Sequence, residues 1–154
     1  PLRTTADVEA LRSAVADGTL SVLATDHAPH TDEEKDSDFE NAPFGIVGLD
    51  CALGLYAKAL IDSGHIDWSR LVALLTIEPA RLVGLERQGI GRLEIGLPAD
   101  ITVIDPDMSW TIDPDEFASK GRNTPFAGLE VTGRATMTIV GGTISHQLDQ
   151  SLKV

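Results

Sequence analysis

The chain has 154 residues, of which 42% are hydrophobic and 23% are charged, and this composition is typical of a globular protein rather than a disordered one. Its formal net charge of −12 at pH 7 argues against a nucleic-acid partner, because such binding depends on clustered Lys and Arg. No apolar run reaches the roughly 18 to 20 residues that span a bilayer and no signal segment opens the chain, so we expect a cytoplasmic protein without a membrane partner.

The first predicted element is a helix that begins at Thr4 and ends near Gly18. Thr4 and Asp7 have the spacing of a capping box, with Asp in place of the usual Glu. Val8, Leu11 and Val15 then recur at helical spacing. The sequence therefore predicts an amphipathic helix directly before the next segment.

The uncharged run over residues 20–25 ends in Asp26, which is followed by His27 and His30. Its apolar residues do not alternate with polar ones, which is typical of a parallel strand covered on both faces. The C-terminal ends of such strands carry the active sites of α/β proteins, so Asp26 is a candidate catalytic or ligand residue. The alternative is that Asp26 caps a turn enforced by Pro29 and that both histidines are solvated. The residues alone leave both interpretations open.

The middle of the chain is predicted to be a solvated acidic loop followed by helices. A long helix is expected from Leu49 to Leu60, with its N-terminus just after Gly45 and facing the tip of the preceding strand. Asp67 is expected to cap a third helix, and Thr76 a short fourth one. Cys51, the only cysteine, lies among apolar residues and is expected to be buried.

From Gly89 onward the sequence favours strands. β-Branched residues gather in 101–104, 110–112 and 130–140, separated by Gly and Pro turns. Gly141 and Gly142 suit a tight hairpin into a last strand, where His146 is expected to point outward. A second, β-rich unit is therefore predicted to begin near residue 89.

Several stretches of this sequence together resemble the C-terminal part of the dihydroorotases, which are metal-dependent cyclic amidohydrolases of pyrimidine biosynthesis. The stretches are Thr25-Asp-His-Ala-Pro-His30, Asn41-Ala-Pro-Phe-Gly-Ile-Val-Gly-Leu49, Gly91-Arg-Leu-Glu-Ile-Gly-Leu-Pro-Ala-Asp-Ile-Thr-Val103, Lys120-Gly-Arg-Asn-Thr-Pro-Phe126 and the opening Pro1-Leu-Arg3. The resemblance covers nearly the whole chain. The combination is far more specific than any single motif.

The fold that this resemblance implies is α/β. Residues 1–88 would be the C-terminal part of a (β/α)8 metal-dependent hydrolase barrel, with 20–25 as its closing strand and with some of its outer helices. Residues 89–154 would supply the C-terminal strands of an accessory β-sandwich domain.

The resemblance also implies the site. Asp26 would bind a metal and carry a proton to the departing amide nitrogen, His30 would bind the carboxylate of dihydroorotate, and the backbone around Pro43 and Gly45 would hydrogen-bond the ring. His27 receives no ligand role. The expected cofactor is Zn²⁺, with one or two ions. Because a catalytic zinc takes about three protein ligands and the chain has no His-x-His pair, the remaining ligands are expected outside this chain.

The function implied is reversible hydrolysis of dihydroorotate to N-carbamoyl-aspartate, with this chain an incomplete fragment that is inactive alone. The expected partners are dihydroorotate, the missing N-terminal part, and either a second copy or an aspartate transcarbamoylase.

One alternative is a non-catalytic dihydroorotase-like scaffold subunit, against which Asp26 and His30 argue. Hydantoinase and allantoinase share the scaffold, but His30 and the stretch 121–126 look more like dihydroorotase.

Overall fold

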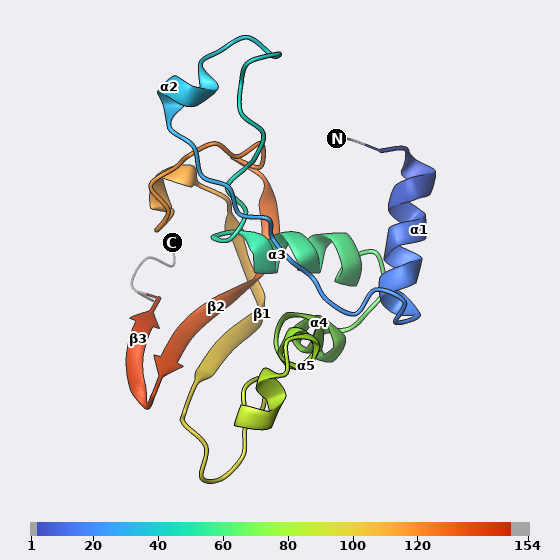
Figure 1. Ribbon diagram of the computed structural model, residues 1–154, viewed down its shortest axis with the longest axis vertical. Helices are drawn as coiled ribbons and strands as arrows, with labels where there is room; N and C mark the ends of the chain where they lie inside the picture. The colour runs from blue at the N-terminus through green and yellow to red at the C-terminus, as the bar shows by residue number, and fades with distance from the viewer. Residues whose placement is uncertain (1–2, 149–154) are drawn as a thin grey trace.

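The computed structural model describes residues 3–148 (Figure 1). Its helices are α1 (Thr5–Ala16), α2 (Asp32–Lys35), α3 (Ala52–Tyr56), the π-helix η1 (Ala57–Ile61), α4 (Trp68–Leu75), α5 (Ile77–Leu82) and the 3₁₀-helices η2 (Leu85–Gln88) and η3 (Pro114–Glu116); its strands are β1 (Ile101–Thr111), β2 (Glu130–Val140) and β3 (Thr143–Gln147). Within this part of the chain, no helix combines the length and the apolar character that a membrane crossing requires. Residues 1–2 of the resembling opening stretch and residues 149–154 of the predicted β-rich part lie outside the described residues.

Helix α1 confirms the first prediction, including its cap. The Thr4 hydroxyl accepts a hydrogen bond from the Asp7 N–H at 3.2 Å, and the Asp7 carboxylate accepts one from the Thr4 N–H at 3.0 Å. The helix packs through Val15 against Leu60 and Leu74, which form one buried cluster with it. The capping box therefore starts the helix, and its single buried side chain attaches it to the other helices.

Residues 20–25 do not form the predicted buried closing strand. They run without regular pairing, and Leu20 and Ala24 are exposed. Leu23 N–H donates to Leu74 O at 3.2 Å, and the Tyr56 hydroxyl donates to Ala24 O at 2.7 Å. A parallel strand needs a strand beside it, and residues 3–148 place none beside this segment. No residue of 20–25 is fully buried, and pairing partners decide whether an apolar run becomes a strand.

The helices after the acidic loop follow the predicted order with two corrections. The long helix begins at Ala52 rather than directly after Gly45, because the segment between them runs extended and pairs at Ile46 with His27. Asp67 caps α4 as predicted, since its carboxylate accepts from the Arg70 N–H at 2.8 Å. Thr76 precedes α5, but its hydroxyl donates back to Val72 O at 2.7 Å and does not cap that helix.

The C-terminal part forms an antiparallel sheet in the order β1-β2-β3. The two strands predicted over 101–104 and 110–112 are one strand, β1, with an irregular register between Asp105 and Ser109. The hairpin through Gly141 and Gly142 joins β2 to β3 as predicted, and His146 is exposed on β3.

Helix α3 lies across the sheet, and the two share a core (Figure 1). Its buried side chains come from the segment before α3, from the stretch after β1 and from β2: Val47, Cys51, Ile112, Phe117 and Val131. Leu55 of α3 and Trp110 of β1 are partly buried against them. A Cβ atom on Gly54 would lie 2.7 Å from Val131 Cγ2, so only glycine allows α3 to approach β2 this closely. Cys51 is fully buried as predicted, and burial raises the pKa of its thiol.

Candidate functional site

Asp26, the predicted catalytic and metal-binding residue, has an unusual backbone. Its φ of 47° is the only positive value for a non-glycine residue within 3–148. The left-handed region is costly for most side chains, and Asp and Asn tolerate it best. The side chain is exposed, and no described residue donates a hydrogen bond to its carboxylate. Backbone strain of this kind gathers at functional sites, where a side chain must be held in a required position.

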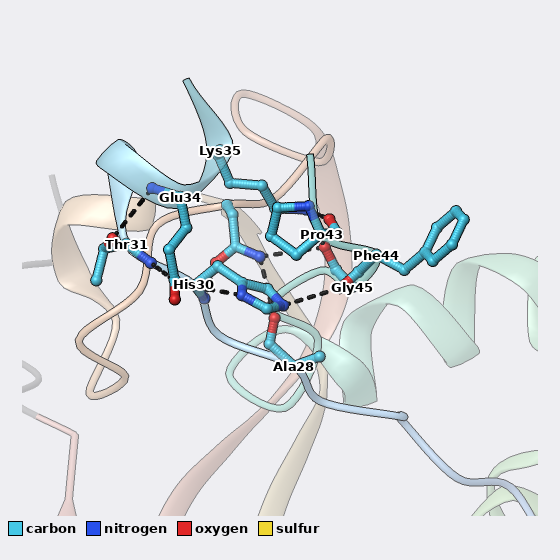
Figure 2. A network of polar contacts seen from close by, with 9 residues as sticks. Ala28, His30, Thr31, Glu34, Lys35, Pro43, Phe44 and Gly45 are labelled. Carbon is cyan, nitrogen blue, oxygen red and sulfur yellow. Dashed lines mark hydrogen bonds and ion pairs between the residues drawn. The ribbon is translucent and has the colours of Figure 1, made fainter. Parts of the chain in front are cut away.

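His30, predicted to bind the substrate carboxylate, contacts two oxygen acceptors. Its Nε2 donates to Phe44 O at 2.8 Å, and its Nδ1 lies 3.2 Å from a carboxylate oxygen of Glu34 (Figure 2). The imidazole therefore lies between a backbone carbonyl oxygen and a carboxylate oxygen. Glu34 is itself fixed, because it accepts from the Thr31 N–H at 3.1 Å within the capping box of α2.

Pro43 and Gly45, predicted to present backbone groups to the substrate, are held by Lys35. The Lys35 ammonium donates to Pro43 O and Gly45 O, each at 2.7 Å (Figure 2). A Cβ atom on Gly45 would lie 2.5 Å from Ala28 Cβ, so glycine is required for this segment to lie against the one that contains His30. Both carbonyls are thus occupied. Within residues 3–148 the Gly45 N–H has no acceptor and remains free for a ligand.

The six acidic residues of this loop are all exposed, as predicted for most of them, and Lys35 is the half-buried residue of 31–40. The Glu34 carboxylate contacts His30, and the Lys35 ammonium donates to the Pro43 and Gly45 carbonyls (Figure 2). The predicted substrate-binding residues His30, Pro43 and Gly45 are brought into one hydrogen-bonded network. Asp26 lies outside that network. Composition alone cannot distinguish the contacts of Glu34 and Lys35 from a run of solvated charges.

Asn123 also joins this network, and sequence reasoning assigned it no individual role. Its Oδ1 accepts from the His30 N–H at 2.9 Å, and its Nδ2 donates to Ala28 O at 3.0 Å and to Gly45 O at 3.2 Å. The only available signal was its place in the resembling stretch 120–126.

His27, which received no ligand role, links three segments. Its Nδ1 accepts from the N–H groups of Gly48 and Leu49 at 3.3 and 3.1 Å, so the proton resides on Nε2, which lies 3.2 Å from the Ser119 hydroxyl. That hydroxyl donates to the Asp50 carboxylate at 2.6 Å. Burial raises the pKa of Asp50, but hydrogen bonds from the Ser119 hydroxyl and from the N–H groups of residues 118 and 119 outweigh it and leave that pKa below its usual value.

Two hollows flank the site. One of about 370 Å³ lies beside His30 and is bordered by Lys120 and Arg122 and by the carboxylates of Asp32 and Glu34. The other, of about 610 Å³, is mainly apolar and is lined by residues of α1, α3 and η1 together with Thr25 and Phe126. Thr25, at the end of the unpaired segment 20–25, is the residue of that segment that borders it.

The described residues alone do not form a zinc site. No cluster of three or more His, Cys, Asp or Glu side chains suited to a metal occurs within 3–148. Asp26 offers one exposed oxygen ligand of the right chemistry, whereas a catalytic zinc takes about three protein ligands. This donor set is incomplete within the described residues.

The sequence model of the amidohydrolase family matches residues 2–145. The chain belongs to this family. It is 51% identical over 147 residues to a dihydroorotase of Pelotomaculum thermopropionicum, covering 96% of this chain and 34% of that protein. It is 52% identical over 144 residues to a dihydroorotase of Geobacillus thermodenitrificans, covering 94% and 33%. The resemblance to dihydroorotases is thus confirmed, and the chain spans about a third of the length of these relatives.

Solved structures support the fold. An L-hydantoinase (dihydropyrimidinase) from Arthrobacter aurescens superposes with a TM-score of 0.86 at 29% identity, covering 96% of this chain and 33% of that one. The likeness shows that this amidohydrolase chain has the α/β fold of part of such an enzyme.

Proposed function

We propose that this chain is the C-terminal part of a dihydroorotase that reversibly hydrolyses dihydroorotate to N-carbamoyl-aspartate, in the cytoplasmic pathway of pyrimidine biosynthesis. One observation carries the proposal: His30, Pro43 and Gly45, which the dihydroorotase resemblance selects as substrate-binding residues, lie in one network. The relatives of about 50% identity support the choice of substrate. Zn²⁺ is the proposed cofactor, with Asp26 as one ligand and the others from outside this chain.

In the proposed reaction, the oxygen of a water molecule adds to the ring carbonyl carbon. The bond from this carbon to the ring nitrogen then breaks, and the nitrogen takes up a proton. Asp26 would accept the proton that the water loses and return it to the nitrogen, because its carboxylate is exposed and engaged by no described residue. A metal, when bound, supplies Lewis acidity for such a hydrolysis.

The substrate carboxylate would bind at His30. It would replace Phe44 O as acceptor of the Nε2–H, and a charge-assisted hydrogen bond is stronger than the neutral one it replaces. The free Gly45 N–H would donate to a ring oxygen. Lys35 occupies the neighbouring carbonyls and so keeps that N–H in position.

The test joins the 154 residues to the rest of the Pelotomaculum thermopropionicum dihydroorotase, and we call this fusion the completed protein. It is assayed with zinc in both directions. Asp26→Asn should lower turnover about 10² to 10⁴-fold, which is the usual effect of losing a general acid and base. The fold should survive, because Asn tolerates the positive φ of this position. Asp107→Asn, at an exposed position of β1, is the matched control. Near-normal turnover by the Asp26 variant at unchanged zinc content would contradict the assignment.

A second candidate function is hydrolysis of hydantoin or dihydrouracil, which the likeness to hydantoinases favours. These rings lack the carboxylate that His30 is proposed to bind. The completed protein is therefore assayed with all three substrates. A higher kcat/KM for hydantoin than for dihydroorotate would favour the second candidate. Turnover of none of them, together with binding to an aspartate transcarbamoylase, would favour a scaffold subunit.

A further inference from the structure

The amide of Asn123 connects two segments that lie far from it in the sequence. One is the segment of His30, at a separation of 93 residues, and the other is that of Gly45, at 78 residues. We propose that Asn123 is a positioning residue that holds these two segments in register and thereby sets KM for the substrate. The inference about KM rests on the proposed function, whereas the inference about register does not.

The hydrogen bonds of Asn123 fix the orientation of its amide. The oxygen faces a donor, the His30 N–H, and the nitrogen faces two acceptors, Ala28 O and Gly45 O. The reversed amide would place its NH₂ group against an N–H and its oxygen against two carbonyls. Only one orientation is therefore favourable, and the part-buried amide acts as a rigid spacer between the two backbones.

The backbone around Asn123 supports the same arrangement. Asn123 O accepts from the Val47 N–H at 3.0 Å, which extends the contact beyond Gly45. A Cβ atom on the buried Gly121 would lie 2.8 Å from Pro29 Cβ and 3.1 Å from His30 O. The stretch 121–123 thus packs directly on both segments. Neither Asn123 nor Gly121 is among the groups proposed to touch the substrate, so the effect of Asn123 must pass through His30 and Gly45.

Two variants distinguish the contact made by the amide oxygen of Asn123 from the contacts made by its amide nitrogen. Asn123→Ala removes every side-chain contact. Asn123→Asp retains an acceptor for the His30 N–H but turns a second oxygen toward Ala28 O and Gly45 O, which repels them. The charge-matched control is Gln147→Glu, because it makes the same amide-to-acid change at an exposed position of β3.

The first measurement is a double-mutant cycle in the completed protein. Asn123→Ala should raise KM for dihydroorotate about tenfold and change kcat about twofold or less, since a lost positioning contact weakens binding of the carboxylate. If Asn123 acts largely through His30, adding Asn123→Ala to His30→Ala should raise KM only about twofold further. Fully multiplicative effects on KM, or an unchanged KM in the Ala variant, would overturn the inference.

The second measurement does not depend on activity. The backbone N–H of His30 should exchange with deuterium about tenfold faster or more in Asn123→Ala than in the wild type, because Asn123 Oδ1 is its acceptor. Asn123→Asp, which retains this acceptor, should exchange more slowly than Asn123→Ala, and its control Gln147→Glu should leave the rate unchanged. If the wild-type completed protein hydrolyses no dihydroorotate, the proposed function fails, and the exchange rate still decides whether Asn123 holds the segments in register. An unchanged rate overturns the inference in either case.

Discussion

His27 Nε2 lies 3.2 Å from the Ser119 hydroxyl, which ties the residue directly after Asp26 to a loop that follows the first strand of the sheet. Because Ser119 also donates to Asp50 at 2.6 Å, the hydroxyl joins three segments at one point. The backbone that carries the proposed catalytic carboxylate is therefore stabilised from the C-terminal part of the chain.

Ser119→Ala should lower the thermal midpoint of the completed protein. The substitution removes the donor to Asp50 and the partner of His27, and a net loss of about 1 kcal/mol is usual for such a side-chain hydrogen bond. Ser37→Ala, at an exposed loop position, serves as the matched control in the same calorimetric scan. Equal midpoints for the two variants would mean that the Ser119 contacts contribute nothing to stability.

The depressed pKa of Asp50 predicts an acid-sensitive contribution to stability. A carboxyl group with a lower pKa in the folded protein stabilises it above the unfolded pKa, near 3.8, and this stabilisation is lost as the pH falls through the folded value. The thermal midpoint of Asp50→Asn should therefore lie below that of the wild type by a constant amount from about pH 5 upward. The difference should shrink as the pH falls below about 4. A gap that persists undiminished in acid would contradict this prediction.

Lys35→Met should loosen the Pro43–Gly45 backbone while retaining most of the apolar stem. It removes the donor to two carbonyls, of which only Gly45 O keeps another partner, the Asn123 amide. We expect a KM for dihydroorotate that is about threefold to tenfold higher, through displacement of the Gly45 N–H. Steady-state kinetics check this result beside Lys58→Met, which removes an exposed ammonium from η1. A KM shift of the same size in both variants would point to a general effect of charge.

Gly133→Ala should destabilise the packing of α4 against β2. A Cβ atom there would lie 2.7 Å from Trp68 Cζ2, and the φ of +94° disfavours any side chain. Gly96→Ala is a close control, since its φ is +95° and nothing lies within 4 Å of the added carbon. The Gly133 variant should lose about 1 to 3 kcal/mol more unfolding free energy than the control, as overpacked sites do. Denaturant titrations that give equal losses would show that Trp68 moves aside without cost.

The 154-residue chain alone should show no dihydroorotate hydrolysis and should bind zinc weakly, because Asp26 is its one proposed ligand. It should also self-associate, since the apolar hollow of about 610 Å³ bordered by Thr25 and Phe126 is open to solvent. Light scattering gives its mass, and mixing it with the separately made remainder of the relative tests for restored activity. Substantial turnover by a monomer of this chain would refute the incomplete-site argument.

Local signals in the sequence predicted local structure well. The capping box at Thr4, the Asp67 cap and the Gly141-Gly142 hairpin each depend on residues a few positions apart, and the structure contains all three. The strand predicted over 20–25 is not formed. Strand formation depends on the presence of adjacent strands, and the residues of 20–25 do not specify these. Lys35 and Asn123 were missed for a related reason. Their hydrogen-bond partners are backbone carbonyls and a backbone N–H. Such groups are common to nearly all residue types, so the sequence does not reveal which of them are partners.

The core that joins Val47 and Cys51 to Ile112 and Val131 limits where this part of the protein can be exchanged between relatives, during evolution or in the laboratory. A recombination crossover near residue 88 would pair one parent's α3 with the other parent's sheet. At Gly54 the approach to Val131 leaves no room for even a methyl group, so mismatched parents would clash there. Residues 47–131 should therefore come from a single parent. Hybrid proteins that fold should have their crossover points outside this stretch.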